Sequence, residues 1–387
     1  LFDAHRAAVP DAAGTSVASR RVPRRPPASN IDSSPIELSD PKAIHKMATG
    51  ARAFAEKVKG KHIVGFLGVT GVGKTTFMRY LLGHHMALHK YITDGGHEIT
   101  VIDSDVPSDN LVIGHEKESQ TQEPFMERAP AMGDNVYLVD LPGDFDTSMQ
   151  TSVLLRHALT KAFVLRNAAS VRLVMMLSCE VLSVKRGASV EDDLADVLNL
   201  FPDSQTQSCM LTLVSPVGRD SLGANLRNLT EQSTIGHIRS IRCEVEGLTR
   251  GRECTQTTSF FTKLNASLHE TELALQAGRA PTSPICYAAN PLRGDELDTV
   301  RRFVMSRPAC SDRSFNVAIP SKVSDVLLDA CRRLLDRAVA ALNSLKLSPC
   351  DDLEGGAAAA AILLDLLNML VDDLQLDLRG LVELKQK

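Results

Sequence analysis

The sequence has no tryptophan, and aromatic residues make up only 4% of its 387 residues. Because hydrophobic residues still account for 43% of the chain, we expect a core built mainly from aliphatic side chains. The eight cysteines are scattered, with no C-x-x-C pair and no spacing typical of metal ligands. His84, His85 and His89 cluster together, but no Glu or Cys completes a metal site there. We therefore expect reduced thiols in a cytoplasmic protein, and a solvated helix end at these histidines.

A strong charge of one sign is absent as well. The formal net charge is −4 and the isoelectric point is about 6.3, so the chain as a whole does not attract nucleic acid or anionic lipid. Its densest basic cluster, residues 20–25, lies in a segment rich in Pro, Ser, Ala and Arg. We expect this segment to be a disordered tail whose basic cluster is solvated or docks on an acidic surface, and we expect no nucleic-acid partner.

Long apolar runs without charges are also absent. The most apolar run begins at Gly355, but Asp365 and Asp372 interrupt it, so no membrane span is predicted. The chain from residue 321 onward is rich in leucine at helical spacing, which predicts helices that pack on the same chain, on a second copy or on a partner protein. The first residues do not form a signal peptide. Because the sequence begins with Leu1, we expect a truncated N-terminus that leaves targeting open.

The most informative stretch combines an apolar segment, a glycine-rich loop and a helical pattern. Residues 62–67 are mostly apolar, residues 68–75 spell G-x-x-x-x-G-K-T, and an apolar run then ends at Gly83. The glycines let successive backbone N–H groups point at phosphate oxygens, Lys74 adds positive charge, and the Thr75 hydroxyl can bind Mg²⁺. By chance the pattern would occur in about 1% of chains this long. A flexible turn is the alternative, but the flanking strand and helix favour a nucleotide phosphate site.

A second motif follows another predicted strand at residues 135–139. It begins with Asp140, ends with Gly143 and spells D-x-x-G. An acid at a strand end can hold Mg²⁺ through water, and the Gly143 N–H can reach a γ-phosphate. ATPases of the Walker type more often place a second acid directly after the first, whereas Leu141 follows here. With both motifs the chain resembles the P-loop GTPases, and V-D-L-P-G is similar to a variant in septin-like, dynamin-like and immune-associated GTPases.

The resemblance implies further site residues. Members of these families carry a switch threonine, often in an S-x-T setting, which Thr121 matches; an ordinary loop residue is the alternative. After the strand at residues 210–215 they carry [NT]-K-x-D, but this chain has Pro216 in place of the lysine. Asp220 lies two places late, and either substitutes within an Arg-Asp pair, as in guanylate-binding and atlastin-like GTPases, or belongs to a turn. Ala289 lies where the families place a small-residue loop against the base.

The resemblance thus implies a GTP-binding protein with Mg²⁺, a slow GTPase that acts as a nucleotide-dependent switch. Two alternatives stay open: an ATP-binding ATPase or phosphotransferase, and a nucleotide-binding scaffold without turnover. The implied catalytic residues are Lys74 and Thr121, and the implied metal ligands are Thr75, Thr121 and Asp140. The implied nucleotide-binding residues are Gly68, Val69, Thr70, Gly71, Val72, Gly73, Lys74, Thr75, Thr76, Asp140, Gly143, Asp220 and Ala289.

Strands that alternate with helices predict an α/β fold with a doubly wound, mostly parallel sheet. We expect a disordered tail and lead-in helix over residues 1–54 and a nucleotide-binding domain over residues 55–307. That domain should contain a helical insertion at about residues 221–283. A helical C-terminal extension is expected over residues 308–387.

Overall fold

The computed structural model describes fourteen parts of the chain. They are residues 20–21, 41–68, 72–92, 98–104, 124–142, 151–178, 197–201, 208–215, 231–250, 255–279, 285–287, 291–292, 294–311 and 315. The helices in these parts are α1 (Pro41–Val58), α2 (Lys74–Leu82), α3 (Thr151–Asn167), α8 (Glu231–Thr249), α9 (Gln256–Gln276) and α10 (Leu297–Met305), with 3-10 turns η1 (Pro130–Met132) and η3 (Gly294–Glu296). The strands are β1 (Arg20–Arg21), β2 (His62–Gly68), β3 (Met86–Ile92), β4 (Glu98–Ser104), β5 (Phe125–Arg128), β6 (Val136–Asp140), β7 (Ser170–Ser178), β8 (Met210–Ser215) and β9 (Ile285–Tyr287).

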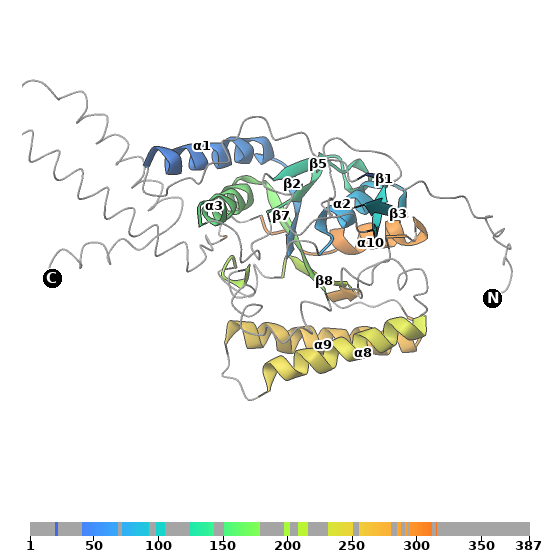
Figure 1. The fold of residues 1–387 in the computed structure, drawn as a ribbon. Coiled ribbons are helices and arrows are strands. Elements are labelled where there is room, and N and C mark those ends of the chain that lie inside the picture. The colour runs from blue at the N-terminus through green and yellow to red at the C-terminus, as the bar shows by residue number, and fades with distance from the viewer. Residues whose placement is uncertain are drawn as a thin grey trace, which may run out of the picture.

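The main sheet has six strands in the order β5-β6-β2-β7-β8-β9 (Figure 1). Strand β5 runs antiparallel to β6, whereas β6, β2, β7, β8 and β9 are parallel to their neighbours. The predictions of an α/β fold and of a mostly parallel sheet are therefore confirmed. The strand order reverses at β2, since the chain goes next to β5 and β6 on one side and afterwards to β7 on the other.

Helices cover both faces of this sheet. Along β2, Ile63 and Leu67 belong to one core cluster, while Val64 and Phe66 belong to another, because alternate residues of a strand face opposite sides. The first cluster includes residues of α1, α3, α8 and α9; the second includes residues of α2 and α10. Burial on both faces explains why β2 reads as an almost continuous apolar run. Each fully buried aliphatic side chain contributes about 1.5–3 kcal/mol.

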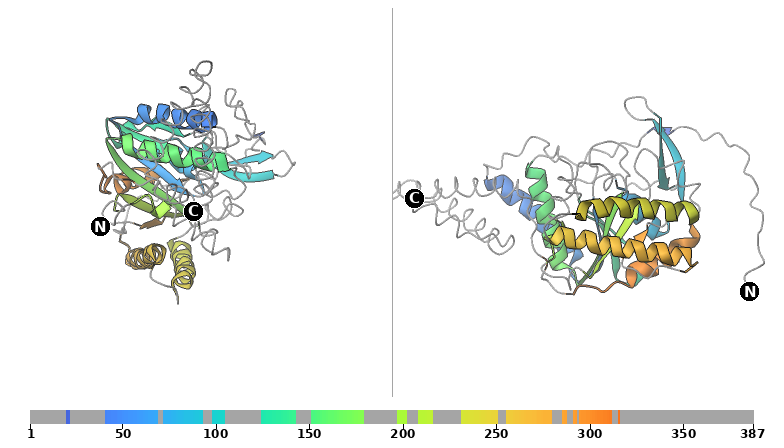
Figure 2. Two further views of the ribbon diagram at one scale, coloured as in Figure 1. Left: turned by 90° about the vertical axis from the view of Figure 1, so that its left-hand side faces the viewer. Right: turned by 90° about the horizontal axis from the view of Figure 1, so that it is seen from below.

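A smaller sheet has the order β1-β3-β4, and its β3–β4 hairpin projects from the body of the molecule (Figure 2). The prediction of a solvated helix end agrees with the structure at His84 and His85, which follow the end of α2, and is wrong at His89, which is buried in β3. Helix α2 ends at Leu82, Gly83 follows with φ 90°, and β3 begins at Met86. Pairing with β4 supplies the backbone hydrogen bonds that a helix would have made. The hairpin's base is anchored because Met86 and Ile102 are buried in the second core cluster.

Two residues of the predicted disordered tail are ordered, so that prediction is wrong at this point. Arg20 and Arg21 form β1, which pairs in parallel with Tyr91 and Ile92 of β3. Main-chain pairing of this kind depends little on side-chain composition, which is why composition did not reveal it. Helix α1 lies where the lead-in helix is predicted, packs against α3 and contains the boundary that we predicted between residues 54 and 55.

The two long helices α8 and α9 lie side by side within the span of the predicted helical insertion (Figures 1 and 2). Their apolar residues at helical spacing, such as Ile238 and Leu264, are fully buried in the first core cluster. A capping box at the start of α9 joins Thr255 and Thr258: the Thr258 N–H donates to Thr255 Oγ1, and the Thr255 N–H donates to Thr258 Oγ1. The two helices therefore form a hairpin that packs on the sheet as a unit.

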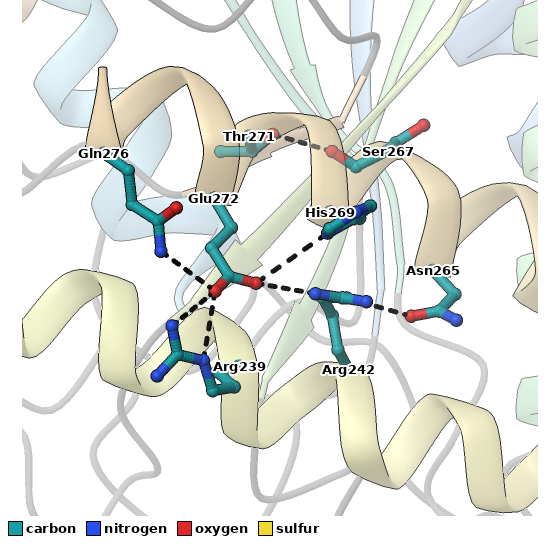
Figure 3. Close-up of polar contacts among 8 residues, drawn as sticks. All are labelled: Arg239, Arg242, Asn265, Ser267, His269, Thr271, Glu272 and Gln276. Atoms are coloured by element: carbon teal, nitrogen blue, oxygen red, sulfur yellow. Dashed lines mark hydrogen bonds and ion pairs between the residues drawn. The ribbon is translucent and has the colours of Figure 1, made fainter. Parts of the chain in front are cut away.

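A group of charged and polar side chains, which we call the Glu272 cluster, ties α8 to α9 (Figure 3). The Glu272 carboxylate is 4% exposed and accepts hydrogen bonds from Arg239 at 2.7 Å, from Arg242 at 2.6 Å and from Gln276 at 3.3 Å. Burial disfavours the charged carboxylate, but the hydrogen bonds and charges of the two arginines outweigh it and hold the pKa of Glu272 below its usual value. The cluster is thus satisfied by its own members.

Most of the predicted C-terminal extension lies outside the described residues, including the leucine-rich part. The part that is described returns to the sheet: Cys310 forms an antiparallel bridge with Val171, and the Phe315 ring packs edge-on against Phe201. None of the described helices combines the length and the apolar character that crossing a bilayer requires.

Candidate functional site

Strand β2 ends in a glycine that the sheet itself requires. Gly68 has φ 137°, a conformation that other residues rarely adopt. A Cβ at this position would lie closer than 3.0 Å to the carbonyl oxygen of Met176 on the neighbouring strand β7. The backbone can therefore leave the sheet here only with glycine, and the loop that follows begins directly at the carboxyl end of a central strand.

Helix α2 begins on the far side of this loop with a buried lysine. Gly73 precedes the helix with φ 94°, and Lys74 is its first residue and is 7% exposed. The Lys74 Nζ donates a hydrogen bond to the Gly68 carbonyl oxygen at 2.8 Å, which joins the start of α2 to the end of β2. Burial lowers the pKa of Lys74, and the nearby Asp140 carboxylate partly opposes this shift. An anion arriving at this end of α2 would stabilise the charged lysine and meet the positive end of the helix dipole.

A carboxylate from the next strand completes the arrangement. Asp140, the last residue of β6, is 2% exposed and stands in register with Phe66 of β2. The Thr75 hydroxyl donates a hydrogen bond to Asp140 Oδ2 at 2.7 Å. Because β2 and β6 are neighbouring parallel strands, their carboxyl ends bring the lysine, the threonine and the aspartate to one place. This is the point where the strand order reverses, which is where open α/β sheets commonly bind ligands.

The donor set fits Mg²⁺ held jointly by protein, water and a ligand. Within the described ranges, no group of three or more His, Cys, Asp or Glu side chains lies together, so these residues alone do not form a complete metal cage. Mg²⁺ usually keeps several waters and takes only one or two protein oxygens together with phosphate oxygens. The Thr75 hydroxyl and the Asp140 carboxylate, already in contact, are oxygens of the right kind.

The structure brings together the predicted site residues that it describes at the two strand ends, namely Gly68, Gly73, Lys74, Thr75 and Asp140. Val72 is partly buried against the second core cluster, and Thr76 is partly exposed in the first turn of α2. The other predicted site residues lie outside the described residues: Val69, Thr70, Gly71, Thr121, Gly143, Asp220 and Ala289.

Sequence analysis missed a buried ion pair beside this site. Arg79 of α2 donates a hydrogen bond to Asp103 of β4, and their side chains are 4% and 9% exposed. Ser104 and His84 lie next to the pair, with Ser104 Oγ 3.4 Å from His84 Nδ1. One signal was available in the sequence, because Arg79 interrupts an apolar helical run and Asp103 ends an apolar segment. Charges in such settings are rare unless they are paired.

Comparison with models of known protein families finds no match for this chain, and comparison with curated protein sequences finds none either.

Proposed function

We propose that this chain binds a guanine nucleotide together with Mg²⁺ and hydrolyses GTP slowly, as a P-loop GTPase that acts as a switch. The observation that carries the proposal is the meeting of Lys74, Thr75 and Asp140 at the carboxyl ends of β2 and β6. A buried ammonium and a helix N-terminus suit phosphate, while the hydroxyl and the carboxylate suit Mg²⁺.

Each residue has a chemical task under this proposal. The Lys74 ammonium would exchange the Gly68 carbonyl for phosphate oxygens and would neutralise charge that develops on them. Thr75 would bind Mg²⁺ directly, and Asp140 would bind it through water. Bound Mg²⁺ supplies positive charge that draws electron density from the phosphates. Thr121 and Gly143 would sense the γ-phosphate, as the resemblance to GTPases implies.

The choice of guanine over adenine rests on the sequence. The D-x-x-G motif that begins at Asp140 and the S-x-T segment that ends at Thr121 both resemble those of GTPases. Ser215, the last residue of β8, is followed by Pro216 instead of the usual lysine, so the contact to guanine is out of register. A site with a weaker contact to the base discriminates less. We therefore expect GTP to be preferred over ATP by a smaller factor than in GTPases with an intact N-K-x-D motif.

The first test is to identify the nucleotide that copurifies with the protein and to compare GTP and ATP affinities by competition. We expect GTP to bind more tightly, and Asp220→Asn to reduce this preference. Tighter binding of ATP would favour the ATPase or phosphotransferase, and no binding of either nucleotide would refute the proposal. If Asp220→Asn retains the full preference, Asp220 is a turn residue.

Turnover provides a second test. Ras-like GTPases orient the attacking water with a glutamine directly after D-x-x-G, whereas this chain has Asp144, whose carboxylate would be repelled by the γ-phosphate. We expect slow hydrolysis that rises on self-association or with a protein partner, either of which would supply the missing group. Fast hydrolysis that is independent of protein concentration would contradict this expectation, and single-turnover measurements that show no hydrolysis would favour the scaffold.

A further inference from the structure

We infer that Arg79 and Asp103 are a positioning pair that sets the rotation of α2 and thereby places Thr75 for Mg²⁺. The inference rests on the proposed function. Arg79 follows Thr75 by four residues, so the two side chains leave the same side of the helix one turn apart. Thr75 contacts Asp140 on β6, and Arg79 contacts Asp103 on β4. Two contacts one turn apart, to two different sheets, define how the helix is turned about its axis.

Apolar packing fixes only one side of this helix. Helix α2 has nine residues, and Phe77, Met78, Tyr80 and Leu81 are all buried at 2% exposure or less. Because successive residues of a helix point about 100° apart, these four side chains lie within an arc of about 160°, and Arg79, which is also buried, points to the opposite side. The orientation of that opposite side therefore depends on the contact that Arg79 makes.

The ion pair fixes the opposite side of the helix. A turn of one residue would take the Arg79 guanidinium away from Asp103 and leave buried charge without its partner, which is among the most costly changes in a protein interior. Buried polar groups that select one register among several apolar alternatives are the best-attested use of such pairs. The pair therefore favours the single orientation in which Thr75 meets Asp140.

Asp103 is itself held in place, as an anchor must be. It stands in register with Ala87 in the β3–β4 hairpin, and the Ser104 N–H donates a hydrogen bond to Asp103 Oδ1 at 2.7 Å. The neighbouring Ile102 is 3% exposed in the second core cluster. The base of the hairpin thus forms a fixed support, and α2 is aligned against it.

The test measures the affinity of the full chain for GTP twice, once with Mg²⁺ and once with EDTA. The affinity with Mg²⁺ divided by the affinity with EDTA is a quotient that reports on the metal site. We expect Arg79→Met and Asp103→Asn each to lower this quotient about tenfold or more, as loss of a supporting shell does at metal sites. The double variant should lower it no further than either single variant, because both remove the same contact. The matched control is Arg242→Met in the Glu272 cluster, which should lower the unfolding temperature and leave the quotient unchanged.

An unchanged quotient in folded Arg79→Met and Asp103→Asn would overturn the inference, because the pair would then only stabilise the fold. If Arg79→Met does not fold, Arg79→Lys decides the matter: it keeps a charge but directs it differently, so a lowered quotient supports the positioning role and a wild-type quotient contradicts it. Absence of GTP binding by the wild type would refute the proposed function itself, which separates the two failures.

Discussion

The N-terminal end of α2 and the Glu272 cluster both bury charged side chains from separate elements, but the groups that contact those side chains differ. Glu272 accepts hydrogen bonds from Arg239, Arg242 and Gln276, so its charge is balanced between two helices (Figure 3). Lys74 instead reaches back to a backbone carbonyl, and burial lowers its pKa. An anion would improve the environment of Lys74, whereas it would have to displace Glu272 from its arginines.

Position in the fold accounts for this difference. The Glu272 cluster lies along the contact between two helices, where side chains from both partners fill the space. Lys74 and Asp140 lie at the carboxyl-end edge of two neighbouring parallel strands, and the next described helices after these strands, α2 and α3, belong to different core clusters. The place of buried charges in the fold, and not their burial alone, therefore indicates a binding site.

The comparison predicts first that a substitution in the α8–α9 hairpin can lower the stability of the fold without changing GTP affinity. Phe261 of α9 is fully buried in the first core cluster. Phe261→Ala should lower the free energy of unfolding by about 3–5 kcal/mol, through lost apolar burial and the cavity left behind. Denaturant unfolding measures this loss, and Phe261→Leu should cost less. GTP affinity measured where the variant is still folded should equal that of the wild type, and a weaker affinity would show that the two regions are coupled.

Lys74→Ala should have the opposite effect, with weaker GTP binding and an intact fold. Charge-assisted contacts to phosphate contribute about 1.5–3 kcal/mol, so GTP should bind at least about tenfold more weakly. The fold should persist, because alanine favours helices and the substitution removes a buried charge. Binding of a fluorescent GTP analogue provides the measurement, with Lys59→Ala as the exposed control. Wild-type affinity in Lys74→Ala would exclude this end of α2 as the site.

Glu272→Gln should weaken the fold and not the site. Loss of the charge removes charge-assisted hydrogen bonds from two partly exposed arginines, which costs about 1–3 kcal/mol. Because the folded state holds the pKa of Glu272 below the ordinary value of 4.5, this stability is present at neutral pH and is lost as the pH falls below 4.5. The wild type and the variant should therefore converge in acid. Glu244→Gln, on the exposed side of α8, is the control, and equal stabilities at pH 7 would contradict the prediction.

The smallest effect is expected at His84, beside the ion pair of α2. Burial and the charge of Arg79 hold the pKa of His84 below the ordinary value of 6.5, although Glu127 opposes the shift. Below pH 6.5 the unfolded chain therefore binds more protons than the folded chain, and stability should fall. His84→Asn should make the unfolding temperature depend slightly less on pH between pH 7 and pH 5. His85→Asn is the control and should leave this dependence as it is in the wild type. A slope that is unchanged would show that His84 does not contribute to it.

The central parallel strands of the main sheet could be predicted because local pattern and burial agree there. The apolar runs that become β2, β6, β7 and β8 are buried on both faces, and α2 ends at a glycine as its sequence indicates. The cluster of Lys74, Thr75 and Asp140 was also predictable, since parallel strands that alternate with helices bring their carboxyl ends to one edge.

The β3–β4 hairpin and its ion pair could not be predicted in the same way. The local pattern of residues 86–90 does not predict a strand, and only pairing with a segment ten or more residues later makes them one. The contact between Arg79 and Asp103 also depends on this pairing. The register of β4 against β3 decides that Asp103 faces α2. Long-range choices of this kind leave little trace in a local pattern.

The requirement for glycine at position 68 would constrain the evolution of this sequence. The lack of a side chain at Gly68 is demanded by the Met176 carbonyl of the neighbouring strand, whether or not a nucleotide is bound. A descendant that had lost nucleotide binding would still be selected to keep glycine at this position, while Lys74 would be free to drift. Under the proposed function, the lysine and not the first glycine of the motif would therefore mark the descendants that bind phosphate.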